Sequence, residues 1–416
     1  MRKIFKKINC CRICSSKRLV KIINLDNQHI QGSFIKPNLP KPYLKKIPLI
    51  LVLCKKCSLV QLLHTTNKDI LYKNYWYQSG INKTMRDHLK DIVRDLLKIN
   101  KKKNKEYNIL DIGCNDGTLL KFYPKKINKY GIDPSQIISK IDKNKVKTFR
   151  DFFPPKKNEF KKLNIKFDII TSIAMFYDLD DPNIFVKEIK NFLKSDGIWV
   201  FELSYLLDML KLNSFDTICH EHLEYYSLTS LEYLMKKHEL KIFKISKNDI
   251  NGGSIRCYVT HIRNMRYNTT KNIKEVKKLL RFENKIKISS INIYKDFFKR
   301  IKKLRYNTIS LLNKIIRENK TIHIYGASTK GNTILQWYGI DKKIIKYAAD
   351  RNKEKWNAKT ISSEIQIISE EKSRKLKPDY YFVLPWHFKS EFLKREKKFL
   401  YSGGKMIFPL PKLKIY

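Results

Sequence analysis

Long apolar runs are missing from this sequence of 416 residues. No segment approaches the roughly 20 consecutive apolar residues that a membrane-spanning helix needs. The first residues, MRKIFKKINCCRIC, are basic, but no apolar stretch follows them, which argues against a secretory signal. We therefore expect a cytoplasmic protein with no membrane partner, in a compartment that keeps its thiols reduced.

Acidic residues are scarce relative to basic ones. Asp and Glu number 39 against 87 Lys and Arg, which gives a formal net charge of +48. Such a balance often indicates nucleic-acid binding, because basic side chains neutralise phosphates. Here the lysines are spread among Asn and Ile in every segment, and no basic stripe or Arg-rich tail stands out. We interpret the charge as a compositional bias that favours anionic substrates, and we expect no nucleic-acid partner.

The length is too great for one ordinary hydrophobic core, and it suggests two to three domains. Hydrophobic residues make up 42% of the chain and aromatic residues 12%, which is enough to build such cores. We predict three domains in an α/β protein: a zinc-binding module over 1–80, a cofactor-binding domain over 81–245, and a C-terminal Rossmann-like domain over 246–416.

Four of the eight cysteines form two CxxC pairs, Cys11 with Cys14 and Cys54 with Cys57. In a reducing compartment such pairs indicate metal ligands rather than disulfides. Two of these tight turns complete the tetrahedral sulfur shell that zinc prefers. Because four thiolates leave no open coordination position, we expect one structural zinc ion at these cysteines.

A glycine turn between a strand and a helix opens the second segment, in ILDIGCNDGTLLKFY. It is not the GxGxxG dinucleotide fingerprint, because three residues separate Gly113 from Gly117. It resembles motif I of class I methyltransferases, in which an acidic residue and the glycines surround the methionine part of the cofactor. A carboxylate about twenty residues on, Asp133, can accept both ribose hydroxyls. The expected contacts of S-adenosylmethionine are Asp111, Gly113, Asn115, Asp116, Gly117, Asp133, Pro134 and Phe152.

Strands and helices alternate through the rest of this segment, as a doubly wound sheet requires. A helix is expected over 84–97, because its apolar positions follow helical spacing. The run FDIITSIAMFYDLDDP reads as a buried strand followed by a loop. Since ligands bind at the carboxyl ends of such strands, Tyr177 is expected to face the active site.

Two histidines flank one carboxylate in ICHEHLEYY: His220, Glu221 and His222. The spacing differs from HExxH and no third ligand is evident, so a metal site is disfavoured. Histidine titrates near neutrality and a neighbouring carboxylate can orient it, which favours acid–base chemistry. The structural alternative is a polar approach to the following helix.

The third segment contains NGGSIRCYV, a Lys-rich helical stretch over about 271–319, and then TIHIYGASTKGNTIL. The last is again strand, turn and helix, which predicts a second Rossmann-like unit. It is not a Walker A loop, because Lys330 precedes Gly331. Backbone N–H groups and the Lys330 ammonium would meet an anion there.

Several motifs in fixed order resemble one family, the zinc-containing sugar C-methyltransferases that alkylate nucleotide-linked keto-deoxysugars. They are CRIC, CKKC, YKNYWYQSG, DIGCNDGTLL, ICHEHLEYYSL, NGGSIR and YGASTKGNTIL. The resemblance covers nearly the whole chain. It implies a zinc module, a cofactor domain and a C-terminal domain that helps to hold the nucleotide sugar. The implied reaction is methylation at carbon three, next to a ketone at carbon four, through an enolate.

Position by position, the resemblance makes His222 the base, with Glu221 beside it and Tyr77 as a hydroxyl on the substrate side. His220 and Tyr177 complete the catalytic candidates. The expected substrate contacts are Tyr75, Ser254, Arg256, Ser328 and Lys330. The chain departs from the family's pattern at Cys219, where an aromatic hydroxyl is usual, and in the MFYDLDDP loop, where a histidine is usual.

Two alternatives remain open at this point. One is methylation of an oxygen or nitrogen on a related sugar or small anion. The other is a nucleic-acid enzyme or binding protein, which the charge and the cysteine pairs favour, although no NPPY-type motif follows the fourth strand. The sequence leaves the nucleotide, the sugar, the stereochemistry and the choice of monomer or dimer open.

Overall fold

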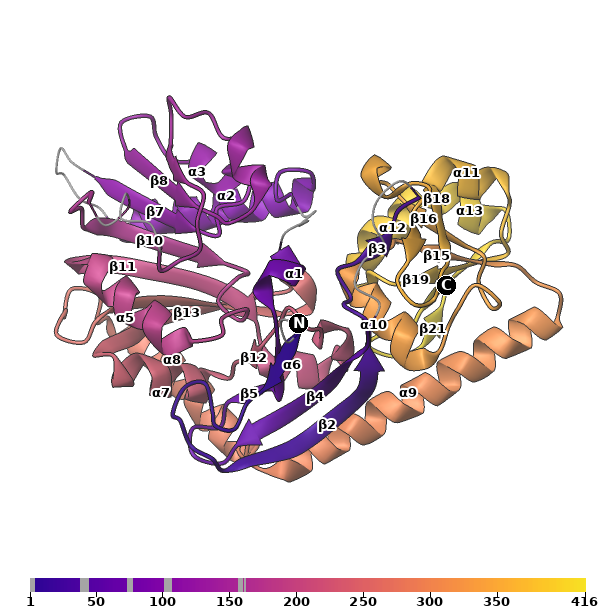
Figure 1. Cartoon of the computed structure of the whole chain (residues 1–416), viewed down its shortest axis with the longest axis horizontal. Helices are drawn as coiled ribbons and strands as arrows, with labels where there is room; N and C mark the ends of the chain where they lie inside the picture. The colour runs from indigo at the N-terminus through magenta and orange to yellow at the C-terminus, as the bar shows by residue number, and fades with distance from the viewer. Residues whose placement is uncertain (1–3, 38–44, 73–77, 101–106, 156–159, 161) are drawn as a thin grey trace.

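The computed structural model describes residues 4–37, 45–72, 78–100, 107–155, 160 and 162–416. Within those residues the chain forms a small N-terminal antiparallel sheet, a seven-stranded sheet and an eight-stranded sheet (Figure 1). This is the α/β architecture predicted from the sequence. In the same described ranges, no helix combines the length and the apolar character needed to cross a membrane.

The N-terminal module is built around an antiparallel sheet with the strand order β12–β5–β4–β2. One strand of this sheet, β12, comes from a much later part of the chain, so the module is completed by the middle domain. A separate pair joins β1 with β6. The elements are β1 (Phe5–Lys7), β2 (Leu19–Gln28), β4 (Ile47–Cys54), β5 (Val60–Leu62), β6 (His64–Thr66), α1 (Lys68–Tyr72) and β12 (Glu224–Tyr225).

The middle domain has the strand order β13–β14–β11–β10–β7–β8–β9. The five strands from β11 to β9 are parallel, and β14 lies antiparallel between β11 and β13. Because β7 has β8 on one side and β10 on the other, the strand order reverses there, which is where such sheets bind ligands. The strands are β7 (Asn108–Ile112), β8 (Asn128–Ile132), β9 (Lys147–Phe149), β10 (Phe167–Ile173), β11 (Leu193–Ser204), β13 (Leu240–Asn248) and β14 (Ser254–His261).

Amphipathic helices cover this sheet. The helix expected over 84–97 is confirmed as α2 (Lys83–Ile99), capped by Asn82, whose side chain accepts from the Thr84 N–H at 2.9 Å. Its apolar face packs against the sheet through Leu89, Ile92, Val93 and Leu96. The other helices of the domain are α3 (Thr118–Lys121), α5 (Pro182–Phe192), α6 (Leu206–Lys211), α7 (Leu228–Lys237) and α8 (Thr270–Lys285).

The Lys-rich stretch over 271–319 forms α8 and then the long helix α9 (Ile291–Arg317). With 27 residues, α9 is about 40 Å long and runs from beneath the middle domain to the C-terminal domain (Figure 1). The domain boundary expected at 245 falls inside β13, and the middle sheet continues to His261 because β14 inserts between β11 and β13.

The C-terminal domain is the second Rossmann-like unit predicted from the sequence. Its strand order is β21–β20–β19–β15–β16–β18–β17–β3, with a parallel centre and antiparallel edges. The edge strand β3 (Phe34–Ile35) is supplied by the N-terminal module. The remaining elements are β15 (Ile322–Tyr325), α10 (Thr329–Tyr338), β16 (Tyr347–Asp350), β17 (Lys359–Thr360), β18 (Gln366–Ser369), α11 (Glu370–Lys375), β19 (Tyr380–Val383), α12 (Lys389–Arg395), α13 (Lys397–Tyr401), β20 (Lys405–Phe408) and β21 (Lys414–Ile415).

Candidate active site and zinc site

The four predicted zinc ligands converge in the N-terminal module. The sulfur atoms of Cys11, Cys14, Cys54 and Cys57 all lie within 4.8 Å of one another. The Sγ atoms of Cys11 and Cys57 are 3.5 Å apart, as are those of Cys14 and Cys54. A tetrahedral zinc ion with bonds of ~2.3 Å separates its sulfurs by about 3.8 Å, so the cluster fits this ion.

The pKa values of the cysteine thiols in this cluster also favour binding of a dication. The hydrogen bond with Cys57 lowers the pKa of Cys11 to about 5, and the same contact raises the pKa of Cys57. Zinc binds cysteine as the thiolate, so a lowered thiol pKa in this cluster favours the metal-bound form.

The predicted cofactor turn lies at the carboxyl end of β7. Gly113, Asn115 and Gly117 have φ values of 72°, 54° and 70°, which favours glycine or asparagine at these positions. Asp111 is fully buried, and burial raises its pKa to about 7, although the Thr171 hydroxyl donates to it at 2.6 Å. The backbone therefore turns tightly at these residues, which allows a ligand to approach it closely.

Asp133, at the end of β8, supports this turn. Its Oδ2 accepts from the Asn115 N–H at 2.9 Å, and its Oδ1 accepts from the Ser135 N–H at 2.8 Å and from the Ser135 hydroxyl at 2.5 Å. A carboxylate offers about four acceptor positions, so Oδ2 can accept one further hydroxyl. This capacity fits a ribose. Pro134 follows directly in the same turn.

The chain over residues 78–80 docks against the cofactor turn, which the sequence alone did not reveal. The Ser79 N–H donates to Asn115 Oδ1 at 3.0 Å, and the Gly80 N–H donates to Asp116 Oδ2 at 2.8 Å. A Cβ at Gly80 would lie 2.7 Å from that oxygen. The side chains of Asn115 and Asp116 thus hold this segment. Tyr75 and Tyr77 lie outside the described residues.

The expected aromatic contact of the cofactor, Phe152, lies just beyond β9, which pairs with β8 next to Asp133. The Lys68 ammonium lies over its ring, 4.1 Å from the centroid. Phe152 therefore sits at the same edge of the sheet as Asp133 and the glycine turn.

The two histidines of the HEH sequence have different surroundings. His220 is 1% exposed; its Nδ1 lies 2.9 Å from Gln31 Oε1 and its Nε2 3.1 Å from the Ile47 carbonyl oxygen. Burial lowers its pKa to about 4. Both ring nitrogens of His220 face protein acceptors, which attaches the loop to the N-terminal module; its place among the catalytic candidates stays a prediction.

His222 is half-buried and turns the other way. Its Nδ1 lies 2.8 Å from the Thr217 carbonyl oxygen, and its ring packs edge-on against Tyr177 with centroids 4.4 Å apart. A carbonyl can only accept, so Nδ1 carries the proton and Nε2 keeps its lone pair. Burial, together with the positive charge of Lys330, lowers the pKa of His222 to about 3. The imidazole is neutral at pH 7.

Glu221 was expected to orient the histidine, but the orienting contact comes from Thr217 instead. The Glu221 carboxylate occupies the space that a Cβ at Gly32 would need, and burial raises its pKa to about 7. Cys219 is buried, with its pKa raised by burial. A thiol therefore stands where the family's pattern has a phenol.

Lys330 and Ser328 lie at the start of α10 in the C-terminal domain, near the loop that carries His222. Ser328 caps α10 by accepting from the Gly331 N–H at 3.0 Å. Lys330 donates to the Asn251 carbonyl oxygen at 2.8 Å, within the NGG turn of the middle domain, and burial lowers its pKa. Lys330 is therefore available as a cation beside His222, whereas the Ser328 side chain is used as a cap.

Arg256 and Ser254, expected to contact the substrate, lie instead in β14 of the middle sheet. Arg256 is 3% exposed, and its Nε donates to Glu202 Oε2 at 2.8 Å. The Ser254 hydroxyl donates to the Ile250 carbonyl oxygen at 2.9 Å. These polar atoms make internal contacts, and substrate binding by either residue stays a prediction.

A buried polar network around Glu202 was missed by the sequence reasoning. Glu202 lies near the carboxyl end of β11, at the same edge as the cofactor turn, and its Oε1 lies 2.5 Å from His88 Nε2. The partners come from α2 and β14, so only the three-dimensional pairing brings them together. Arg256 and His88 lower the pKa of Glu202 against the effect of burial.

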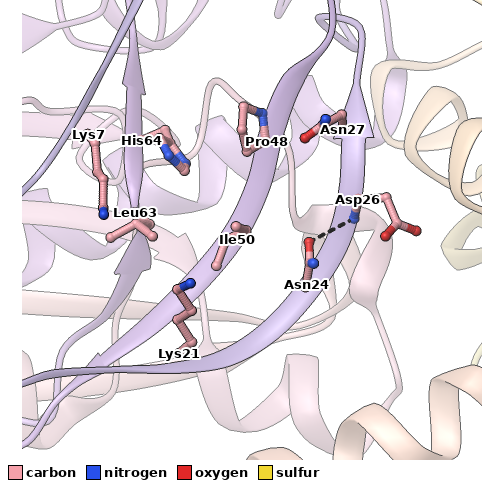
Figure 2. Close-up of a pocket in the computed structure, with 9 residues that line it drawn as sticks. All are labelled: Lys7, Lys21, Asn24, Asp26, Asn27, Pro48, Ile50, Leu63 and His64. Carbon is pink, nitrogen blue, oxygen red and sulfur yellow. Dashed lines mark hydrogen bonds between the residues drawn. The ribbon is translucent and has the colours of Figure 1, made fainter.

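An open hollow of about 400 Å³ lies on the sheet of the N-terminal module (Figure 2). None of the predicted site residues lines it. Its lining is mostly polar and comprises Lys7, Lys21, Asn24, Asp26, Asn27, Pro48, Ile50, Leu63 and His64. The predicted catalytic and cofactor residues therefore lie elsewhere, at the carboxyl edge of the middle sheet and the loop that follows it.

Three family models match successive parts of the chain. The one described as "Putative zinc binding domain" matches residues 11–72, the methyltransferase domain matches 81–245, and the C-methyltransferase C-terminal domain matches 249–411. The chain belongs to the S-adenosylmethionine-dependent methyltransferases. Its cofactor is S-adenosylmethionine, and its four-cysteine cluster is a structural zinc site.

Individual relatives vary in how much of this methyltransferase they cover. C-methyltransferase NovU of Streptomyces niveus is 26% identical over 422 residues, which span 100% of this chain and 98% of that protein. A tRNA U34 carboxymethyltransferase of Campylobacter lari is 30% identical over 117 residues, 24% of this chain and 36% of that protein. The magnesium protoporphyrin IX methyltransferase of Synechocystis, solved with bound SAH, is 10% identical and covers 44% of this chain and 90% of that one, with a TM-score of 0.34.

Proposed function

We propose that this methyltransferase transfers a methyl group to the carbon next to the ketone of a nucleoside diphosphate keto-deoxysugar. The observation that carries the proposal is the state of His222. Its Nδ1 proton is engaged by the Thr217 carbonyl and its pKa is lowered to about 3, so Nε2 is an unprotonated base at neutral pH.

In the proposed reaction, His222 Nε2 takes the proton from the carbon beside the ketone, and the C–H electron pair moves to form an enolate. The positive charge of Lys330, which acts on His222, would support the negative oxygen. The same charge keeps His222 neutral until it accepts the proton. The carbon that lost its proton forms the new bond to the methyl group that S-adenosylmethionine would supply. The S–CH3 bond would break with its electron pair on sulfur, so that S-adenosylhomocysteine leaves.

Further support comes from the C-terminal domain, whose family model is that of C-methyltransferases, and from the similarity to C-methyltransferase NovU over the whole length. The positive NGG and α10 region suits a diphosphate, because Lys330 lies at the start of that helix. We also propose a cytoplasmic location, since none of the eight cysteines, all of which lie in the described residues, forms a disulfide.

The test uses nucleoside diphosphate 4-keto-deoxyhexoses in D2O, first without S-adenosylmethionine. We expect the hydrogen at carbon three to exchange for deuterium at a rate that depends on enzyme, followed on cofactor addition by a new C–CH3 signal in the NMR spectrum. An O–CH3 or N–CH3 product without exchange would establish the alternative of oxygen or nitrogen methylation.

A further inference from the structure

The loop that carries His222 is held by the zinc module as well as by the middle domain. Immediately after His222, strand β12 pairs antiparallel with β5, so that Glu224 lies opposite Gln61. The Leu62 N–H also donates to the Leu223 carbonyl oxygen at 2.9 Å. On the other side, the Leu223 N–H donates to the Tyr177 carbonyl oxygen at 2.8 Å. The loop is thus clamped between two domains.

One side chain connects this clamp to the zinc ligands. Arg12 lies between Cys11 and Cys14 in the sequence, and its side chain is 3% exposed. It donates to the Leu62 carbonyl oxygen and to the Thr65 hydroxyl, both at 2.7 Å, and to Gln61 Oε1 at 3.2 Å. Its Nε lies 3.6 Å from Glu224 Oε1.

Glu224 is 2% exposed, so its carboxyl group depends on this partner. Burial raises the pKa of Glu224, and Arg12 is the largest influence that lowers it. Removing one partner of a buried ion pair is costly, because the other charge is left in a medium of low polarity. The side chain of Arg12 therefore fixes the strand that begins two residues after the base.

We propose that Arg12 is a positioning residue, through which the zinc-bound CxxC turn orients His222. The inference rests on the proposed function of His222 as the base. Zinc would hold the CxxC turn in place and, with it, the side chain of Arg12. Arg12 would hold Glu224, the first residue of strand β12. This strand would in turn hold His222 against the Thr217 carbonyl oxygen. The cofactor turn over 111–117 belongs to the middle sheet and is outside this chain of contacts. The metal thus supports the deprotonation step without touching the substrate.

The test compares Arg12→Met with Arg18→Met in the full-length, zinc-loaded enzyme. Arg18 is an exposed arginine of the same module, close to Cys14. We expect Arg12→Met to retain its zinc and its affinity for S-adenosylmethionine within about twofold. Turnover should fall by about a hundredfold, because a small displacement of a catalytic group has effects of that size. Arg18→Met should behave as the unaltered enzyme does.

Two readouts separate positioning from general damage. Hydrogen–deuterium exchange of the peptide over 217–226 should rise in Arg12→Met, while that over 111–117 stays unchanged. The acid limb of the turnover–pH profile should move to higher pH, because a looser, better solvated His222 regains a pKa closer to its ordinary value. Arg12→Lys, which keeps the charge but not the forked donors, should recover part of the turnover.

Unchanged turnover and unchanged exchange over 217–226 in zinc-loaded Arg12→Met would overturn the inference. If Arg12→Met does not fold, the same measurements on Arg12→Lys and on enzyme treated with a chelator decide the matter, and an equal rise of exchange at both peptides would count against it. Hydrogen–deuterium exchange of the peptide over 217–226 does not depend on which residue acts as the base. Failure of the proposed function would instead appear as an unaltered deprotonation rate in His222→Ala.

Discussion

The indole nitrogen of Trp386 donates a hydrogen bond to Asp216 Oδ2 at 3.0 Å and so joins two residues that lie 170 positions apart. Asp216 is 1% exposed and directly precedes Thr217, whose carbonyl orients His222. The ring of Trp386 also covers Gly252, where a Cβ would lie 3.3 Å from it. The C-terminal domain therefore holds both the NGG turn and the start of the loop that carries His222.

Replacing this donor should destabilise the protein. Burial already raises the pKa of Asp216, and Trp386→Phe leaves its buried carboxyl without the indole hydrogen bond. We expect the free energy of unfolding to fall by about 1–3 kcal/mol, measured by urea denaturation. A double-mutant cycle with Asp216→Ala, which removes the acceptor, checks the assignment. Strict additivity of the two substitutions would show that the contact contributes nothing.

Metal content provides the second prediction. Purified protein should contain about one zinc per chain, measured by mass spectrometry of the metal. Cys57→Ser should abolish tight binding and lower the melting temperature strongly, because structural zinc contributes folding energy directly. Cys10→Ser is the matched control, since Cys10 is exposed and adjacent to the ligand Cys11 but outside the cluster. Full zinc occupancy in Cys57→Ser would contradict the ligand set.

The third prediction concerns the cofactor. Asp133→Ala removes an acceptor for the ribose and also the support of the Asn115 N–H. Charge-assisted hydrogen bonds contribute roughly 1.5–3 kcal/mol, so the affinity for S-adenosylmethionine should fall by roughly ten- to a hundredfold in calorimetric titration. Asp142→Ala, which changes an exposed carboxylate in the same region, should bind the cofactor normally. Equal affinities in the two variants would refute the role of Asp133.

Stability should decrease on acidification, and this is the fourth prediction. Burial lowers the pKa of His220 and His323 to about 4 and that of His222 and His387 to about 3. Below about pH 6.5 the unfolded chain binds protons at these positions and the folded chain does not, so the free energy of unfolding falls as the pH falls.

Buried carboxyls act in the opposite direction. The pKa of Asp111 and of Glu221 is raised to about 7, so each binds its proton more tightly in the folded state between about pH 4 and 7. Burial also raises the pKa of Asp216 and Glu224. The histidines still outnumber these carboxyls, because burial lowers the pKa of four more of them: His29, His64, His238 and His261. The melting temperature should therefore drop between about pH 7 and pH 5, as followed by calorimetry. A melting temperature that rises over this range would show that the carboxyls dominate.

Local pattern was enough to predict the elements but not their pairing across the chain. The CxxC spacing predicted the cysteine cluster, which the structure brings together. The glycine turn with Asp133 predicted a cofactor region, because this signal too lies within a few residues of sequence. The docking of Gly80 on Asp116 and the pairing of His88 with Glu202 carry no such local signal. They arise from packing between elements that are far apart in the sequence.

The same reasoning explains why the substrate contacts were predicted less well. Arg256 carries a charge in a motif that resembles a family signature, and sequence alone does not reveal that Glu202 pairs with it in the interior. The alternation of side chains along HEH also does not show which of the two histidines is buried, because the burial depends on Gln31 and Ile47 of the N-terminal module. Burial of polar side chains is a property of the tertiary structure.

The last prediction separates the two histidines of the loop. His222→Ala removes the unprotonated Nε2, and positioned general bases contribute roughly 100- to 10,000-fold, so turnover should fall by at least about a hundredfold while cofactor affinity is kept. Deuterium exchange at the carbon beside the ketone, measured without cofactor, should fall in parallel because it isolates the deprotonation step.

His220→Ala should behave differently. It removes contacts of a buried ring with Gln31 and Ile47, so its main effect should be a lower melting temperature. Deuterium exchange at the carbon beside the ketone should fall less than in His222→Ala. In the unaltered enzyme, a base whose pKa is about 3 stays unprotonated at all higher pH values, so turnover should show no acid limb near pH 6.5. If His222→Ala exchanges the proton at the normal rate, the base is another residue, and the Tyr177 loop becomes the next region to test.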